Sequence, residues 1–243
     1  MRRVLYFSLL LVLIMAACAP AAATEAPADV SEEPTSTPDA GELTPETEAT
    51  GPAETAVIKQ LAMNLGLEEE DISVLRSEEV KFRDACLGVA IEGMLCAQVV
   101  TPGREIVLEA DGIQYAYHTS KDGSRIQPAT PALFWKREGG IAGFCDTLTV
   151  FRSGEVFTSK CNSQAEGMMG SFATLLSARE RQQFNEWMAE FGAAELDASD
   201  PAGVADRMMV TLSIAGAGDE PPTQAQQQEL FEFAQELYQE LGQ

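Results

Sequence analysis

The sequence predicts an α+β protein in which a disordered acidic tether is followed by two small domains, each with helices packed on one face of an antiparallel sheet. Runs with alternating apolar residues are joined by short glycine-containing turns, which suit antiparallel neighbours. Other runs place apolar residues at i, i+3, i+4 and i+7, the spacing of a half-buried helix. Residues 18–54 show neither pattern and contain no lysine or arginine.

The N-terminus has the pattern of an export signal. Two arginines at positions 2–3 precede an apolar run, residues 4–15, and then Met-Ala-Ala-Cys at 15–18. The run is shorter than the roughly 20 residues of a membrane-spanning helix. The last four residues resemble the lipobox of bacterial lipoproteins. The resemblance implies that residues 1–17 are a signal peptide and that Cys18 is lipidated, which anchors the protein to the extracytoplasmic face of a bacterial cell membrane. The alternative is an ordinary secreted protein in which Cys18 is incidental.

The cysteine count fits a lipid on Cys18. The sequence contains five cysteines, an odd number that would leave one thiol unpaired in an oxidising compartment. If Cys18 carries lipid, the other four fall into two close pairs. We therefore expect the disulfides Cys86–Cys96 and Cys145–Cys161.

The tether and the overall charge limit the classes of partner. Residues 18–54 cannot bury enough apolar surface to offset the entropy of ordering them, so we expect a disordered acidic linker. The formal net charge of the whole chain is −22. Nucleic acid is therefore not an expected partner, because binding it needs clustered basic residues.

The first domain is expected at 55–128. Residues 56–65 predict a helix that ends at Gly66, and 72–75 and 78–82 predict two short strands. Asp111-Gly112 predicts a two-residue hairpin. Its register gives two buried pairs, Leu108–Tyr115 and Ile106–Tyr117, and one pair on the other face, Glu105–His118.

Two features of this domain have a structural and a functional interpretation. The only histidine, His118, is expected to form a cross-strand polar pair, because no second histidine points to a metal site. The ring closed by Cys86 and Cys96 either folds over the sheet or is an apolar contact loop. The helix, the following strands and the closing stretch 117–126 resemble the cystatin-like PepSY modules of secreted bacterial proteins.

The second domain is expected at 131–243. Residues 133–140 predict a strand that breaks at two glycines, and 145–151 with 155–161 predict a hairpin. Centring that turn on Ser153 pairs Thr147 with Ser159, Thr149 with Phe157, and Cys145 with Cys161. Capping boxes at Ser177 and Thr223 predict two helices, and 207–216 alternates as a half-buried strand.

A glycine-rich stretch in this domain carries the most specific resemblance. The segments 136–144, 175–188 and 205–216 resemble the emfourin type of inhibitor, small bacterial proteins that block thermolysin-like metallopeptidases. The resemblance implies a partner-binding loop with the residues Gly139, Gly140, Ile141, Ala142, Gly143 and Phe144. The predicted Cys145–Cys161 disulfide, the long connection at 198–203 and the lipid anchor are departures from that pattern.

The residues favour binding over catalysis. With one histidine, paired cysteines and no phosphate-binding or zinc-ligand spacing, we predict a non-enzymatic protein with no cofactor, no metal site and no catalytic residues. The expected function is that of a lipid-anchored binding protein and candidate inhibitor of an extracytoplasmic peptidase. The alternative is a cell-envelope scaffold or ligand-binding lipoprotein without inhibitory activity.

Overall fold

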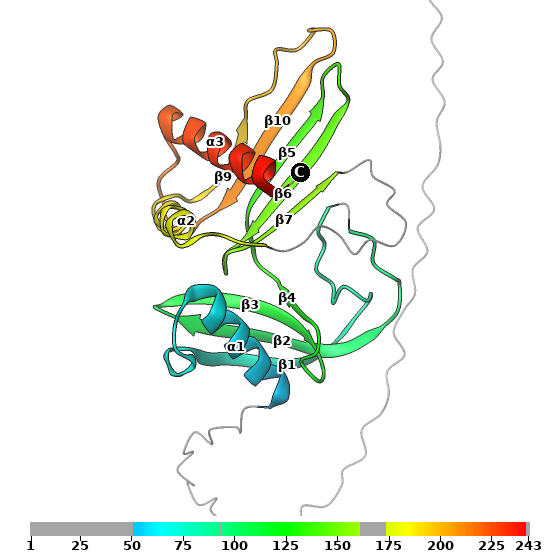
Figure 1. Ribbon diagram of the computed structural model, residues 1–243, viewed down its shortest axis with the longest axis vertical. Helices are drawn as coiled ribbons and strands as arrows, with labels where there is room; N and C mark the ends of the chain where they lie inside the picture. The colour runs from blue at the N-terminus through cyan, green and yellow to red at the C-terminus, as the bar shows by residue number, and fades with distance from the viewer. Residues whose placement is uncertain (1–50, 93, 161–173, 242–243) are drawn as a thin grey trace, which may run out of the picture. The chain divides into compact units, whose positions relative to one another are not determined.

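The computed structural model describes residues 51–92, 94–160 and 174–241, all within one compact unit, Glu48–Gln243. In this part of the chain the elements are three α-helices, one short 3₁₀-helix (Glu69–Asp71) and two antiparallel sheets (Figure 1). The predicted α+β class is confirmed. The predictions for the signal peptide, Cys18 and the tether concern residues that lie outside the described part.

The first sheet has four strands in the order β1-β2-β3-β4 and packs against helix α1. The helix ends because Gly66 adopts a left-handed conformation, with φ of 70°, and its N–H donates to the carbonyl of Ala62. The elements are α1 (Pro52–Leu65), β1 (Ser73–Phe82), β2 (Thr101–Ala110), β3 (Ile113–Ser120) and β4 (Ile126–Pro128).

The β2–β3 hairpin has the predicted register. Leu108 pairs with Tyr115 and Ile106 with Tyr117, and all four side chains are buried beneath α1. Asp111 takes the left-handed conformation that this turn needs. The turn and the alternation of the strands therefore identified the core of this sheet.

The two short strands predicted at 72–75 and 78–82 are wrong. The structure has one ten-residue strand, β1, with a register shift between Val74 and Arg76. A bulge of this kind takes up an extra residue and lets the ladder with β2 continue. Arg76 and Ser77, which lie between the two predicted strands, belong to this strand at the edge of the sheet.

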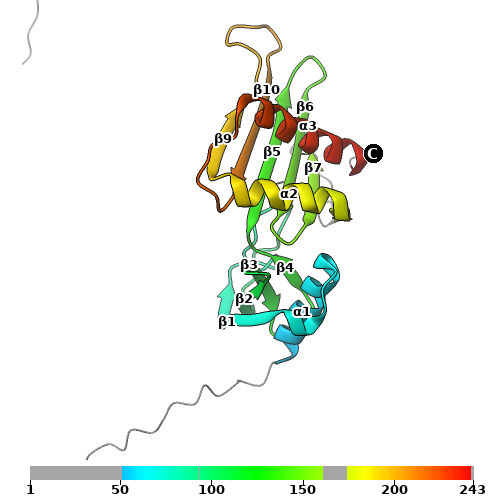
Figure 2. The same ribbon diagram turned by 90° about the vertical axis from the view of Figure 1, so that its left-hand side faces the viewer.

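The second sheet has six strands in the order β8-β7-β6-β5-β10-β9, and helices α2 and α3 cover one of its faces (Figure 2). The core between them includes Trp135, Phe184, Trp187, Phe191 and Leu212. The elements are β5 (Pro131–Gly139), β6 (Phe144–Phe151), β7 (Glu155–Lys160), β8 (Thr174–Leu175), α2 (Ala178–Glu190), β9 (Ala193–Asp197), β10 (Met208–Ala215) and α3 (Gln224–Leu241).

Both the hairpin register and the helix starts match the sequence-based expectation. Thr147 pairs with Ser159 and Thr149 with Phe157. Ser177 and Glu180 form the predicted reciprocal capping box of α2. The short strands β8 and β9 were not predicted, because neither segment alternates strongly enough to be distinguished from a loop.

The α2 cap gives a stability prediction. Replacing Ser177 by Ala removes the side-chain acceptor of the Glu180 N–H, so we expect the free energy of unfolding to fall by about 1 kcal/mol. Ser177→Asn keeps an acceptor and should remain close to wild type. Urea unfolding of both variants measures this, and equal losses in the two would contradict the cap.

Candidate functional site

The loop between β5 and β6 depends on three glycines. Gly139, Gly140 and Gly143 have φ of 94°, 70° and 62°, values that side-chain-bearing residues rarely adopt. A Cβ atom on Gly139 would lie 2.5 Å from the carbonyl oxygen of Arg207. The turn therefore needs glycine for its conformation, and at Gly139 also for the close approach of a second backbone segment.

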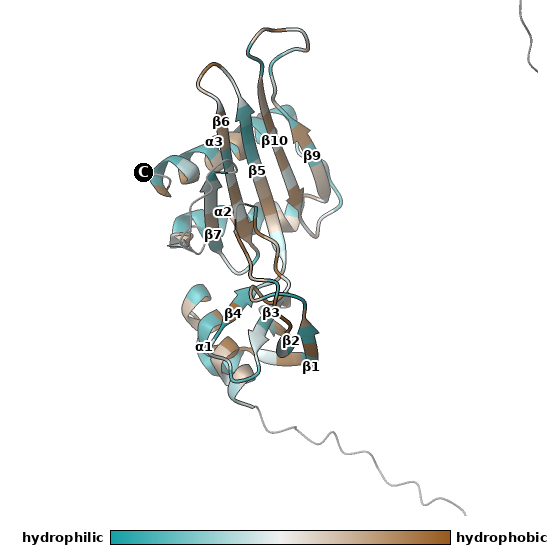
Figure 3. Cartoon of the chain, turned by 90° about the vertical axis from the view of Figure 1, so that its right-hand side faces the viewer, coloured by the Kyte–Doolittle hydropathy of each residue, from teal (hydrophilic) through white to brown (hydrophobic). Residues whose placement is uncertain are grey.

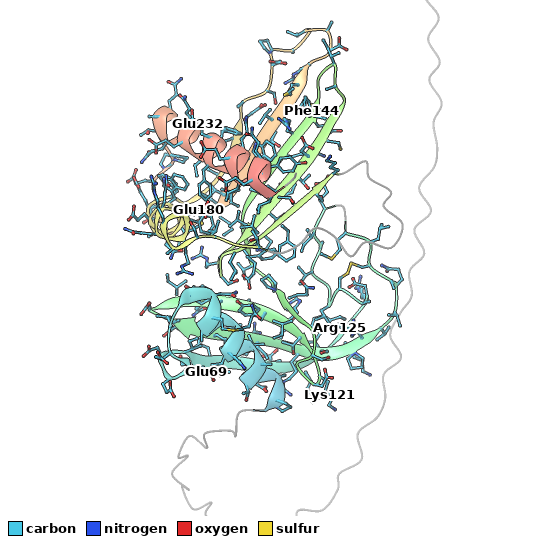
Figure 4. All side chains as sticks on the ribbon, viewed as in Figure 1. Glu69, Lys121, Arg125, Phe144, Glu180 and Glu232 are labelled. Atoms are coloured by element: carbon cyan, nitrogen blue, oxygen red, sulfur yellow. A yellow bond between two sulfur atoms is a disulfide. The ribbon has the colours of Figure 1, made fainter. Side chains whose placement is uncertain are left out.

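The loop exposes one apolar side chain and holds another in place. Ile141 is 92% exposed, and Ala142 beside it is also exposed. Phe144 pairs with Gly139 at the end of the ladder and is half-buried (Figure 4). The guanidinium carbon of Arg137 lies 4.1 Å from the centre of the Phe144 ring. Ile141 is thus available for contact, whereas Phe144 belongs to the base of the loop.

That base is a network of charged and aromatic groups. Arg137 donates from Nε and Nη2 to one carboxylate oxygen of the buried Asp146, at 3.0 and 2.5 Å. The hydroxyl of Tyr238 donates to the other oxygen, at 2.6 Å. Burial, with the negative charge of Asp146, raises the pKa of Tyr238 well above its usual range. The network links β5, β6 and α3, and it fixes the two strand ends from which the loop extends.

A second loop lies beside the first. The sequence did not indicate that these two loops are neighbours. Residues 198–207 connect β9 to β10, and the carbonyl of Arg207 accepts the N–H of Gly140 at 3.2 Å. Asp200 closes this second loop by accepting the N–H of Met208 at 2.9 Å. Val204 is 48% exposed. Both loops extend from the same end of the six-stranded sheet (Figures 1 and 2).

The structure contains the predicted disulfide between Cys86 and Cys96, with an S–S distance of 2.01 Å. Within the ring, Val89 and Ile91 pack on two aromatic residues of the six-stranded sheet, Phe151 and Phe157. These contacts are with the six-stranded sheet, whereas the expectation concerned the sheet of the first domain.

The second predicted disulfide involves a residue outside the described part. Cys145 is disulfide-bonded. Cys161 lies outside the described residues, as does Cys18, so the Cys145–Cys161 bond and the lipidation remain predictions.

His118 has the expected cross-strand partner. Its Nε2 lies 3.7 Å from the carboxylate of Glu105, and its Nδ1 lies 2.7 Å from the carbonyl oxygen of Leu87. One group of potential metal ligands occurs in the described residues, namely Asp84, Cys86 and Cys96. Both of its sulfurs belong to a disulfide, so the group does not have the thiolates that a metal would need.

A buried carboxylate outside the loops was missed by the sequence analysis. Glu155 on β7 is 5% exposed and accepts hydrogen bonds from Asn64 on α1 at 2.6 Å, from Tyr117 on β3 at 3.2 Å and from Ser153. All three donors are neutral. Burial raises the pKa of Glu155, although the hydrogen bonds act in the opposite direction.

Comparison with known proteins gives one match. Residues 54–128, which extend from the first turn of α1 to the end of β4, match a family model described as a domain of unknown function (DUF8738). No curated protein and no solved structure matches the chain. None of the helices in the described part is long and apolar enough to cross a membrane.

The environment of Glu155 predicts a pH dependence of stability. Its folded-state pKa is raised, so the neutral carboxyl stabilises the fold at low pH, and this contribution is lost as the pH rises through that pKa. Glu155→Gln replaces the carboxyl by a neutral amide of similar size. The difference in free energy of unfolding, Glu155→Gln minus wild type, should therefore become more positive as the pH rises.

Urea unfolding at a series of pH values measures this difference. Glu195→Gln, at an exposed position, serves as the control and should show no such trend. A difference between Glu155→Gln and wild type that stays constant with pH would show that the carboxyl does not titrate in this way.

Proposed function

We propose that this protein is a lipid-anchored, non-enzymatic binding protein of the bacterial cell surface, and that its two adjacent loops contact an extracytoplasmic peptidase. The observation that carries the proposal is the exposure of Ile141 at the tip of a glycine-dependent turn. Ile141 is the most exposed of the large apolar side chains in the described residues, and a binding loop uses such a side chain as an anchor.

The foundation of the loop supports this proposal. Arg137 donates a hydrogen bond to Asp146, and its guanidinium lies over the ring of Phe144. The carbonyl of Arg207 accepts a hydrogen bond from the N–H of Gly140. A loop ordered before binding loses less conformational entropy when it enters a cleft. An inhibitor also needs such order, because a loop that adapts freely to the cleft is a substrate.

The resemblance to emfourin-type inhibitors supplies the class of partner. It covers residues 139–144, which include Ile141 and the glycines on which the turn depends. The loop at 198–207 departs from that pattern, and its exposed Val204 offers a second apolar side chain in a loop at the same end of the sheet. The proposed contact surface is therefore formed by both loops.

Inhibition is tested by titrating residues 48–243 against a thermolysin-like metallopeptidase. We expect inhibition at micromolar concentration. Ile141→Asp should weaken it roughly thirtyfold, since burying a side chain of this size contributes about 2 kcal/mol. Leu95→Asp, which changes an apolar residue that is 75% exposed away from the loops, is the matched control and should inhibit like wild type.

Two results would contradict the peptidase proposal. Absence of inhibition with the loops correctly folded would leave the scaffold or ligand-binding alternative. Equal inhibition by Ile141→Asp and wild type would exclude the loop tip as the contact.

The lipid anchor is tested separately in the full chain expressed in a bacterium. We expect the wild type to incorporate labelled fatty acid and to sediment with membranes. Cys18→Ala should lose both properties, while Ala19→Ser, next to it, should keep both. Membrane sedimentation of Cys18→Ala without label would show that something other than lipid holds the protein there.

A further inference from the structure

Strand β9 is an edge of the six-stranded sheet in the described residues, and its free side can be identified from the hydrogen bonds. The N–H of Ala198 donates to the carbonyl of Val210 at 2.9 Å, and the N–H of Asp200 donates to that of Met208 at 2.8 Å. Bonding to a neighbour alternates along an antiparallel strand. The N–H of Leu196 therefore faces β10, and the N–H and C=O of Glu195 face away from the sheet.

The side chains along this edge differ between the two faces of the sheet. Leu196 and Ala194 lie on the face covered by the helices, where both contact the core. The exposed side chains of Glu195 and Asp197 lie on the opposite face, which is turned towards the viewer in Figure 3. A strand added here would therefore meet the carboxylates of Glu195 and Asp197 on one face and helix α3 on the other.

A groove beside the edge provides space for side chains of an added strand. It lies between the end of β9 and helix α3, whose Glu232 is labelled in Figure 4. On the α3 side its lining combines the ring of Phe231 with amides and one carboxylate, from Gln224, Gln227, Gln228, Glu232 and Gln235. Within this groove the half-buried ring of Phe231 offers a contact to an apolar side chain.

The charges exclude two occupants that belong to this chain. Antiparallel pairing of β9 with β9 of a second copy would bring Glu195 and Asp197 of both copies together, and like charges opposite each other destabilise a sheet. Residues 18–54 contain no lysine or arginine and carry acids of their own. Arg207, whose positive charge reaches Asp197, already donates to the carbonyl of Asp200. Glu195 forms no ion pair within the described residues, so its exposed carboxylate complements a positive charge on a partner.

We propose that β9 is a second interaction surface, which binds an extended segment of a partner protein in which lysine or arginine alternates with apolar residues. The segment adds a strand to the sheet through the outward backbone groups of β9. Its basic side chains face Glu195 and Asp197, and its apolar side chains lie towards Phe231 and α3. This proposal does not depend on the loop contact.

The probe is a fluorescein-labelled heptapeptide of alternating lysine and valine, and its binding to residues 48–243 is followed by fluorescence anisotropy. We expect saturable binding that weakens with added salt. The same peptide with glutamate in place of lysine should bind at least about tenfold more weakly, because its charges repel those of the edge.

The matched variants are Glu195→Pro and Glu195→Gln. Both remove the charge, but only proline also removes the outward N–H, and it leaves the ladder with β10 intact. We expect Glu195→Gln to weaken binding a few-fold and Glu195→Pro about tenfold more than that. Thermal unfolding of both variants confirms that the fold is retained.

A change in the peptide covers the case in which Glu195→Pro does not fold. N-methylation of alternate peptide residues removes its backbone donors and should abolish binding to wild type. Absence of lysine–valine binding, equal binding of the acidic peptide, or equal binding of the N-methylated peptide would each overturn the proposal. So would Glu195→Pro binding as tightly as Glu195→Gln.

Discussion

Burial of one face of the six-stranded sheet beneath α2 and α3 is the constraint on which the other features depend. It fixes the register of β5, with Trp135 in the core, and so places Arg137 two residues further along the same face. At that position the core gives way to polar groups, and Asp146 and Tyr238 are within reach of the guanidinium. The order of the glycine loop thus follows from the packing of the helices.

The opposite face of this sheet is covered differently at its two sides. The ring closed by Cys86 and Cys96 contacts the β6–β7 side, where Ser159 donates to the carbonyl of Glu92 at 2.5 Å. Lys136 forms ion pairs with Glu92 and Glu138 at 3.3 and 3.1 Å. The ring thus covers the β6–β7 side of this face. On the β9 side, the acidic side chains of Glu195 and Asp197 remain exposed.

Much of this fold was predictable because strong local signals coincided with tertiary packing. Asp111-Gly112 and the turn at Ser153 fixed two hairpins in register, and Ser177 marked the start of a helix. The strand β9 was not predictable. Its sequence, Ala-Ala-Glu-Leu-Asp, has little strand preference, and it is extended because β10 offers a partner.

The candidate site divides in the same way. The glycines were visible in the sequence, because a turn of this kind needs residues that adopt positive φ. Ile141 was visible as the apolar residue that lies between them. The contact between Gly140 and Arg207, and the carboxylate of Glu155 beneath Asn64 and Tyr117, join residues far apart in the chain. Sequence periodicity and spacing do not predict such contacts, because the partners are brought together only by the tertiary fold.

Strand β10 connects the two surfaces that we propose. Its first residue, Met208, pairs with Gly139 at the loop end of the sheet, and further along Ser213 pairs with Glu195 of β9. Both pairings belong to continuous ladders beneath α2 and α3, whose close-packed core has low compressibility and resists deformation. Occupation of the β9 edge should therefore leave the loop geometry unchanged, so that one partner at each surface is compatible with the same rigid sheet.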